Sequence, residues 1–220
     1  MEQALIQMLA DEAAAIGVSR GPHELDQFSL FYAEFQQRKT KINLPAVTAG
    51  PIFIVKHFLD SLLPLPLIPP SARTLLDMGT GGGFPGIPLA IADWRLRVTL
   101  LEASRKKTSF LNHTVQKLGL HHVLVNKCRV GDSLGNSIGS GQYDVVISRA
   151  TFKLSRFLML ANLYCGYEGV IIAMKGRSWQ KEMDEAGKMI LSNRLQLMLI
   201  REMVLPRSDE IRTLLLFKKT

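Results

Sequence analysis

Apolar and polar residues follow one spacing in the first third of the chain and another in the rest. Up to about residue 63, apolar side chains recur every three or four positions, which is the spacing of amphipathic helices. The helices we expect cover residues 1–16, 22–38 and 51–63. Four prolines between residues 64 and 70 then interrupt the helical pattern. We therefore expect a helical cap at residues 1–70.

From residue 73 onward, short apolar runs alternate with helical segments, a pattern typical of repeated β-α units. The expected helices begin near residue 86 and cover 104–118, 154–164 and 179–193. The expected strands cover residues 74–78, 97–102, 123–127, 143–148, 169–175, 196–204 and 212–218. No helix separates the last two strands, so the sheet should end in an antiparallel pair. Residues 71–220 are therefore predicted to form an α/β domain with a doubly wound sheet.

The first predicted strand runs into a glycine-rich turn, Asp77-Met78-Gly79-Thr80-Gly81-Gly82-Gly83-Phe84-Pro85-Gly86-Ile87-Pro88. A strand, a glycine turn and a helix together present backbone N–H groups to a cofactor. The best frame places Asp77 before glycines 79, 81 and 83. A carboxylate there repels a pyrophosphate and attracts an ammonium, which favours S-adenosylmethionine. A nicotinamide or flavin dinucleotide and a turn without a ligand remain the alternatives.

Other candidate cofactor contacts follow the next strands, because the carboxyl ends of parallel strands meet at one edge. Glu102 ends the second strand and is placed to accept hydrogen bonds from both ribose hydroxyls, although it could instead support a helix N-cap at Ser104. Val130 and Gly131 follow the third strand, where the adenine is expected. Phe84 is either a cofactor contact or a core aromatic.

Cations are also expected at this edge of the sheet. Taken singly, each is an ordinary solvated residue; taken together they favour a phosphate-bearing substrate. The net charge is +8, and residues 71–220 carry 22 basic and 12 acidic side chains against five and seven in residues 1–70. Nucleic acid is the polyanion that this asymmetry suggests first. The candidate substrate-binding residues are Arg105, Lys106, Arg149, Lys153, Lys175 and Arg177.

Several other kinds of site find no support in the sequence. Cys128 and Cys165 lack metal-ligand spacing, and no nucleophile–base pair stands out. The fourth strand ends in Ile147-Ser148-Arg149-Ala150, without the Asn/Asp-Pro-Pro-aromatic run of methyltransferases that act on exocyclic amines. There is no signal-peptide layout and no apolar run long enough for a membrane span. We expect a cytoplasmic monomer without a metal.

At these residues the chain resembles the glucose-inhibited division protein B family, the small-subunit rRNA guanine-N7 methyltransferases. The resemblance spans about residues 31–218. The run Gly83-Phe84-Pro85-Gly86-Ile87-Pro88 is its most specific part. The other matching blocks are Asn43-Leu44, Lys56-His57-Phe58-Leu59-Asp60-Ser61, Lys106-Lys107, Phe110-Leu111, Ile147-Ser148-Arg149-Ala150 and Lys175-Gly176.

The resemblance implies a class I S-adenosylmethionine-dependent methyltransferase fold, Rossmann-like, with an N-terminal helical cap. It implies methylation at N7 of one guanine in the decoding-region loop of 16S rRNA, with cofactor contacts at Gly79, Phe84, Val130, Gly131 and Arg149. Guanine N7 carries a lone pair and no proton, so methylation there needs positioning and electrostatics but no general base. A methyltransferase for another substrate and a non-catalytic RNA-binding module are the alternative functions.

Overall fold

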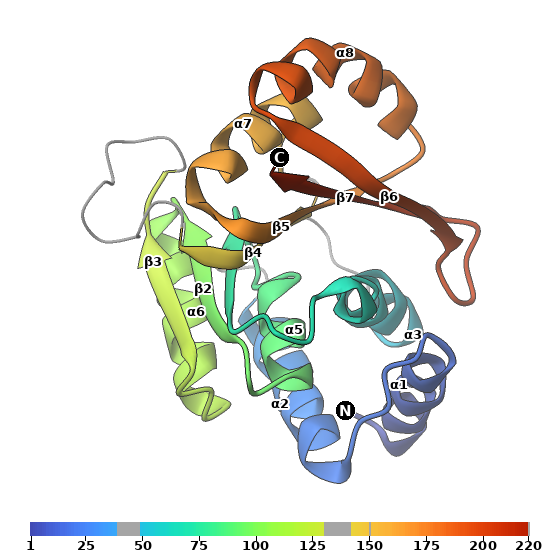
Figure 1. The fold of residues 1–220 in the computed structure, drawn as a ribbon. Helices are drawn as coiled ribbons and strands as arrows, with labels where there is room; N and C mark the ends of the chain where they lie inside the picture. The colour runs from blue at the N-terminus through green and yellow to red at the C-terminus, as the bar shows by residue number, and fades with distance from the viewer. Residues whose placement is uncertain (39–48, 130–141, 150, 220) are drawn as a thin grey trace.

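A computed structural model describes residues 1–38, 49–129, 142–149 and 151–219. These residues form a seven-stranded sheet with helices on both faces, in the order β3-β2-β1-β4-β5-β7-β6 (Figure 1). The first five strands are parallel, and β7 and β6 are antiparallel additions, which confirms the predicted end of the sheet. The strands are β1 (Thr74–Met78), β2 (Arg97–Glu102), β3 (Val123–Lys127), β4 (Tyr143–Arg149), β5 (Cys165–Lys175), β6 (Leu195–Val204) and β7 (Ile211–Lys219).

The predicted strands agree with these bounds closely, except at the start of β5. It begins at Cys165 instead of Gly169, because Cys165 pairs with Tyr143 before the register shifts and Val145 pairs with Val170. The two glycines in this stretch, Gly166 and Gly169, look like a turn in the sequence, which is why the strand was expected to begin later.

The helices lie where the apolar spacing predicts them, with one local difference. The segment expected as a helix at residues 51–63 is helical, but its middle is a π-helix, η1 (Ile54–Leu59), between α3 (Pro51–Phe53) and α4 (Asp60–Leu62). Such π segments occur frequently at functional sites. The remaining helices are α1 (Gln3–Ala15), α2 (Pro22–Arg38), the 3₁₀ turn η2 (Leu65–Leu67), α5 (Gly86–Ala92), α6 (Arg105–Lys117), α7 (Leu154–Tyr164) and α8 (Trp179–Ser192).

Two apolar cores lie on the two faces of the sheet. On one face, α7 and α8 bury residues such as Phe157 and Leu158 against Phe217. On the other, the N-terminal helices share one continuous core with α5, α6 and the strands, containing Phe31, Phe58 and others (Figure 1). The N-terminal segment therefore covers one face of the sheet. The boundary at residue 70 stays a prediction.

The parallel strands give the sheet two chemically different edges. The carboxyl edge is where β1, β2 and β4 end and the glycine turn begins, and β1 and β4 are neighbours there although they are not consecutive in the chain. Such a reversal of strand order is where open α/β sheets bind ligands. The amino edge is where the same strands start. No described helix is long and apolar enough to cross a membrane.

Candidate functional site at the carboxyl edge

The glycine turn is held to the end of β2 and stays open on its outer side. The backbone N–H groups of Gly79 and Thr80 both donate to the carbonyl oxygen of Leu101, at 2.9 and 3.1 Å. Gly79 and Gly81 have φ of +73° and +61°, which side chains rarely adopt. A Cβ on Gly79 would lie 2.5 Å from Cγ2 of Thr151, whereas one on Gly81 would meet nothing closer than 4.0 Å. The turn thus leaves space beside Gly81.

Asp77 is fully buried below the turn. Its Oδ2 accepts a hydrogen bond of 2.8 Å from the Gly86 N–H. Its Oδ1 and the hydroxyl of Thr80, which interacts with this carboxyl group, both lack a hydrogen bond of good geometry among the described residues. Burial raises the pKa of Asp77 to about 6, while the Thr80 hydroxyl, the Gly86 N–H and, less strongly, the positive charge of Arg149 act in the opposite direction. A buried carboxylate oxygen without a donor is costly, so a cationic donor bound here would stabilise it.

Glu102 joins the glycine turn to the start of α6. One carboxylate oxygen accepts from the Gly81 N–H at 3.1 Å and the other from the Ser104 N–H at 2.8 Å. Ser104 is the N-cap of α6, so the expected support for this cap is present. Each carboxylate oxygen can accept more than one hydrogen bond, and Glu102 therefore keeps acceptor capacity for ribose hydroxyls.

Phe84 belongs to the aromatic core of the N-terminal helices, one of the two roles considered for it. Its ring is 5% exposed and lies 5.2 Å from Phe31 and 4.9 Å from the His57 ring, centroid to centroid. The guanidinium carbon of Arg149 lies 5.1 Å from the Phe84 centroid. Phe84 thus provides an apolar and π-electron surface that holds Arg149.

Arg149 is anchored by the segment of η1 and α4. Its Nη1 donates to the Lys56 carbonyl oxygen at 2.9 Å and to Asp60 Oδ2 at 3.0 Å, and its Nη2 lies 3.3 Å from His57 Nδ1. Burial, followed by the positive charges of Arg149 and Lys56, lowers the pKa of His57 to about 3. His57 is therefore neutral, and its Nδ1 can accept a hydrogen bond from Arg149.

Asp60 also binds Arg212 of β7, which makes it the acceptor for two guanidinium groups. Arg212 donates from Nε to Oδ1 at 2.6 Å and from Nη2 to Oδ2 at 2.8 Å. Asp60 is fully buried. Sequence reasoning did not assign roles at this edge to His57, Asp60 or Arg212. Apart from their position in the matching block of residues 56–61, the helical spacing of His57 and Asp60 indicates only a structural pair.

The predicted substrate-binding cations separate into two groups. Arg105, Lys106 and Lys153 are exposed, and their side chains make no hydrogen bond or ion pair with the described residues. Arg177 is exposed and donates to the Asp209 carbonyl oxygen at 2.8 Å. The loops and helix starts that carry these four residues follow the ends of β2, β4 and β5.

Lys175 differs from this expectation. The side chain is buried, and its ammonium donates to the Phe152 carbonyl oxygen and to Glu182 of α8, both at 2.7 Å. With its charge neutralised by Glu182, Lys175 holds the loop after β4 against α8 and does not offer its charge to a substrate. This geometry does not support the expected contact of Lys175 with phosphate or the guanine acceptor edge, which stays a prediction. Val130 and Gly131 lie outside the described residues.

These features fit S-adenosylmethionine. The buried Oδ1 of Asp77 lacks a donor in good geometry, the space beside Gly81 is open, and Glu102 has spare acceptor capacity. Asp77, Glu102 and Arg149 also lie close enough for Arg149 to lower, and Glu102 to raise, the pKa of Asp77, although burial, the Thr80 hydroxyl and the Gly86 N–H act on it more strongly. The three residues that the sequence assigns to the ends of β1, β2 and β4 are thus brought together.

Comparison with known proteins gives a match over residues 24–209 to the family described as rRNA small subunit methyltransferase G. The chain is 38% identical to the protein of that name from Syntrophus aciditrophicus over 215 residues, covering 97% of this chain and 89% of the relative. It is 30% identical to the one from Thermoanaerobacter sp., covering 100% of this chain and 92% of the relative. The chain belongs to this family.

Membership in the rRNA small subunit methyltransferase G family confirms the resemblance seen in the glycine turn. It also confirms the expected enzyme class, a methyltransferase that uses S-adenosylmethionine and acts on small-subunit rRNA.

Solved structures show the same fold at low identity. An O-methyltransferase from Bacillus cereus in complex with SAH is similar with a TM-score of 0.64 and 18% identity, covering 97% of this chain and 100% of that chain. TYW2 from M. jannaschii in complex with AdoMet gives a TM-score of 0.55 and 16% identity, covering 68% and 70%. The class I methyltransferase fold is thereby confirmed.

Within the rRNA small subunit methyltransferase G site, the described residues supply little acid–base chemistry. The histidine nearest to Arg149 is the neutral His57, and its Nδ1 faces the guanidinium. No group of three or more His, Cys, Asp or Glu side chains among the described residues is arranged to hold a metal ion.

Proposed function

We propose that this chain transfers a methyl group from S-adenosylmethionine to N7 of a guanine in the decoding-region loop of 16S rRNA. The observation that carries the choice of atom is that the bases at the carboxyl edge are already engaged: His57 has a pKa of about 3 and its Nδ1 faces Arg149, while Asp77 and Glu102 accept from backbone N–H groups of the glycine turn and of the start of α6. An exocyclic amine or a hydroxyl must lose a proton when it is methylated. Guanine N7 has none to lose, so orientation and electrostatics suffice.

The cofactor would be held by Asp77, Gly79, Gly81, Glu102 and Arg149. Asp77 would accept from its ammonium and Glu102 from its ribose hydroxyls, while the backbone at Gly79 and Gly81 allows close approach. Bound S-adenosylmethionine supplies an electrophilic methyl group on a sulfonium. Phe84 supports this site from the core by holding Arg149. Val130 and Gly131 remain the proposed contacts to the adenine.

Asp60 would act as a positioning residue for Arg149. The acceptors around this guanidinium, which come from Asp60, the Lys56 carbonyl and His57, fix its plane next to Phe84. A planar, multiply held guanidinium is suited to a carboxylate or to the acceptor edge of guanine. We propose that Arg149 binds one of these groups.

The exposed cations Arg105, Lys106, Lys153 and Arg177 would bind phosphates of the RNA. Arg105 and Lys106 occupy the first turn of α6, which contains no acidic residue. Cations at this end of a helix oppose its dipole and cost about 0.3–1 kcal/mol each. Such placement is reasonable where an anion binds, because the helix N-terminus and the side chains then attract the same phosphate.

Asp77, Glu102 and Arg149 of one chain meet at one edge of the sheet, and we propose that a monomer carries out this reaction. Its substrate, small-subunit rRNA, is made where ribosomes are assembled. We therefore propose that this monomer is cytoplasmic.

The test is methyl transfer with radiolabelled cofactor. Three substrates are compared, namely naked 16S rRNA, assembly intermediates and mature small subunits. We expect label in the RNA of at least one of them, and we expect Glu102→Gln to lose cofactor affinity while retaining RNA affinity. Label confined to protein or small metabolites would contradict the proposal. Equal loss of cofactor and RNA binding in Glu102→Gln would show that Glu102 does not have the proposed role.

A further inference from the structure

A second surface with features of an RNA-binding site lies at the amino edge of the sheet. This edge is opposite the carboxyl edge, where the proposed methyl transfer takes place. It is centred on Trp94, in the turn between α5 and β2, whose side chain is 78% exposed. The other tryptophan, Trp179, is partly buried and donates its indole N–H to Glu202. A tryptophan contributes most to stability when buried, so the exposure of Trp94 calls for another explanation.

Two cavities flank this edge. The first, of about 490 Å³, is lined by Trp94 and Arg20 and has an apolar wall that includes Leu65 and Ile68. The second, of about 370 Å³, lies where β2 and β3 begin. Both volumes are in the range of small-ligand pockets. The amino-edge surface, as used below, consists of Arg20, Arg73, Trp94, Arg97, His121 and His122.

Positive charge on the amino-edge surface is only partly neutralised. Arg97 is exposed and its guanidinium makes no hydrogen bond or ion pair with the described residues. Arg73 donates to the carbonyl oxygens of Pro70 and Ala72, which carry no net charge. The Nε of Arg20 is buried without a hydrogen-bond partner among the described residues.

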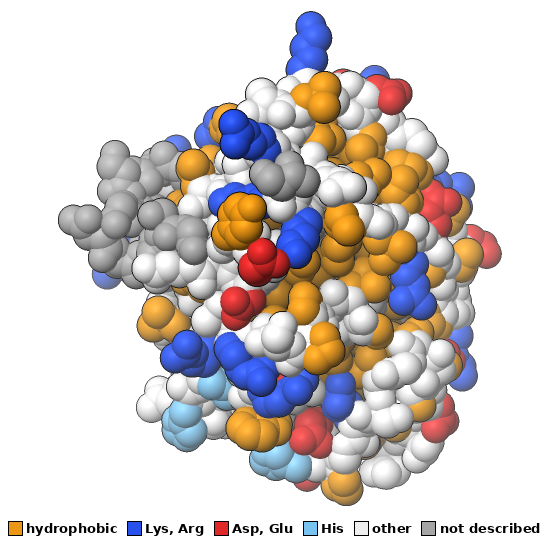
Figure 2. Space-filling view, viewed as in Figure 1, with side chains coloured by type: hydrophobic (Ala, Val, Ile, Leu, Met, Phe, Trp, Pro, Cys, Tyr) orange, Lys and Arg blue, Asp and Glu red, His pale blue; other side chains and the backbone are white. Residues whose placement is uncertain are grey.

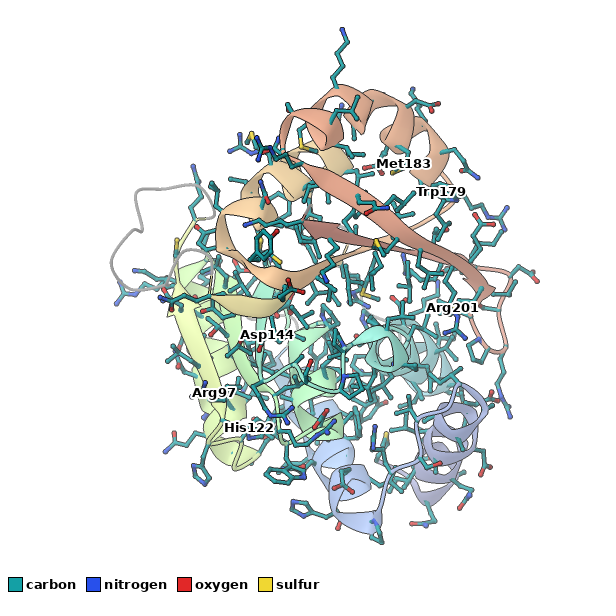
Figure 3. The ribbon with its side chains drawn as sticks, viewed as in Figure 1. Arg97, His122, Asp144, Trp179, Met183 and Arg201 are labelled. Atoms are coloured by element: carbon teal, nitrogen blue, oxygen red, sulfur yellow. The ribbon has the colours of Figure 1, made fainter. Side chains whose placement is uncertain are left out.

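Three acidic residues lie nearby in the described part of the chain, and each has a partner. Glu24 accepts from the Gly21 N–H at 2.9 Å, and Glu24 and Asp93 both interact electrostatically with Arg20, so Arg73 and Arg97 carry the less balanced charge. Asp93 binds Arg95 through both carboxylate oxygens, at 2.9 and 2.7 Å. Asp144 Oδ2 accepts from the backbone N–H groups of Arg73 and Thr74. Figure 2 shows blue and pale blue side chains gathered at the lower left of this face, where Figure 3 labels Arg97 and His122.

We propose that the amino-edge surface is a second contact for the rRNA substrate, with Arg73 and Arg97 on backbone phosphates and Trp94 stacked on an unpaired base. Exposed aromatics beside arginines are the usual means of holding single-stranded RNA without reading its sequence. The proposal rests on the proposed function, since it takes the same RNA as its ligand. Strands of five or six residues separate the two edges by about 17–20 Å. A short target loop cannot reach both edges, but a folded rRNA can.

The test compares Trp94→Ala and Arg97→Gln with matched controls on α8 and β5. Tyr167→Ala removes another exposed aromatic, 73% exposed, and Lys188→Gln removes another exposed cation. For Trp94→Ala we expect a Kd for naked 16S rRNA, and a KM for whichever substrate is methylated, about 5- to 150-fold higher, from the loss of one stacked base, with kcat and cofactor affinity unchanged. Trp94→Tyr should restore most of the loss. Arg97→Gln should reduce the log–log salt slope of RNA binding by about 0.7–0.9.

Other outcomes would overturn the proposal. If Trp94→Ala and Arg97→Gln behave like their controls on naked 16S rRNA, the surface is not an RNA contact. If they impair methylation of assembled particles only, a ribosomal protein covers this surface instead. RNA affinity is measured by filter binding without cofactor, so this test does not depend on methyl transfer. A wild-type protein that binds RNA but transfers no methyl group would contradict the proposed function, and the variants could still be compared for RNA binding.

Discussion

Asp77 is the residue at which stability and function are most clearly opposed. Its folded-state pKa of about 6 lies above the ordinary value of 3.8. Below about pH 4 the carboxyl group is neutral in both the folded and the unfolded protein, and it does not lower the unfolding free energy. As pH rises from there through about 6, the unfolded protein releases this proton more readily, and stability is lost. The shift corresponds to roughly 3 kcal/mol at neutral pH. The sequence places the carboxylate at the right position, but only the structure shows that one oxygen lacks a donor in good geometry.

Replacing Asp77 by Asn should stabilise the protein and weaken cofactor binding. The amide can still accept from the Gly86 N–H and carries no charge to bury. At pH 7.5 we expect the ligand-free variant to unfold a few degrees higher than wild type, and to bind S-adenosylhomocysteine at least about tenfold more weakly. Thermal scans with and without ligand measure both effects.

The pH dependence provides the control for this substitution. The stability advantage of Asp77→Asn should disappear near pH 4, and wild-type affinity for S-adenosylhomocysteine should fall as pH drops below about 6, whereas the affinity of the variant should not follow that titration. A stability difference that is the same at pH 4 and pH 7.5 would contradict the role given to Asp77.

Asp60 is the second residue with a sharp expectation, because it is buried between two guanidinium groups. Asp60→Asn leaves Arg149 and Arg212, 15% and 16% exposed, without their shared counter-charge. We expect a loss of about 3–5 kcal/mol in unfolding free energy, measured by urea denaturation. Tyr167→Ala at the surface should change this energy by less than about 0.5 kcal/mol. A loss as small as that in Asp60→Asn would mean that the cluster does not hold the edge together.

The sequence predicts which residues meet only where their positions at strand ends are enough to bring them together. Asp77, Glu102 and Arg149 end strands, and strand ends meet, so their meeting could be foreseen. The pairing of Asp60 with Arg212 joins residues 152 positions apart, and no periodicity reveals it. The burial and ion pair of Lys175 could not be foreseen, because its partners, Phe152 and Glu182, lie on other elements.

At the scale of elements, α6 offers a test of whether its first-turn cations serve binding. Arg105→Gln combined with Lys106→Gln removes charge that opposes the helix dipole, so the free protein should gain about 0.5–2 kcal/mol. RNA affinity should fall, with a log–log salt slope smaller by up to about 1.8 if each residue contacts a phosphate. Urea denaturation and filter binding provide the two measurements. Stability and RNA affinity that both fall would contradict the binding role.

Most elements could be predicted because their apolar period is clear and glycines or prolines mark their ends. The π segment η1 could not, since it depends on which backbone carbonyl each N–H selects, and the side-chain pattern of residues 51–63 reads as an ordinary helix. Its consequence is local but important, because η1 and the start of α4 carry the Lys56 carbonyl, His57 and Asp60 to Arg149.

At the scale of the whole molecule, the N-terminal helices and the sheet share one core and should unfold together. Phe31 of α2 is fully buried and stacks on Phe58 and Phe84. Phe31→Ala should lower the unfolding free energy by about 3–5 kcal/mol. The protein should still unfold in one transition, with a lower midpoint that is the same by circular dichroism and by tryptophan fluorescence. Two separate transitions, with only the first one displaced, would show that residues 1–70 are an independent unit.

The measurement that tests the account most directly is the identity of the methylated nucleoside. Purified protein is incubated with S-adenosylmethionine and small-subunit rRNA, and the RNA is digested and analysed by mass spectrometry against methylated standards. The proposed function predicts 7-methylguanosine as the product, formed at one position in the decoding-region loop. Methylation of a ribose hydroxyl or of an exocyclic amine would contradict the account.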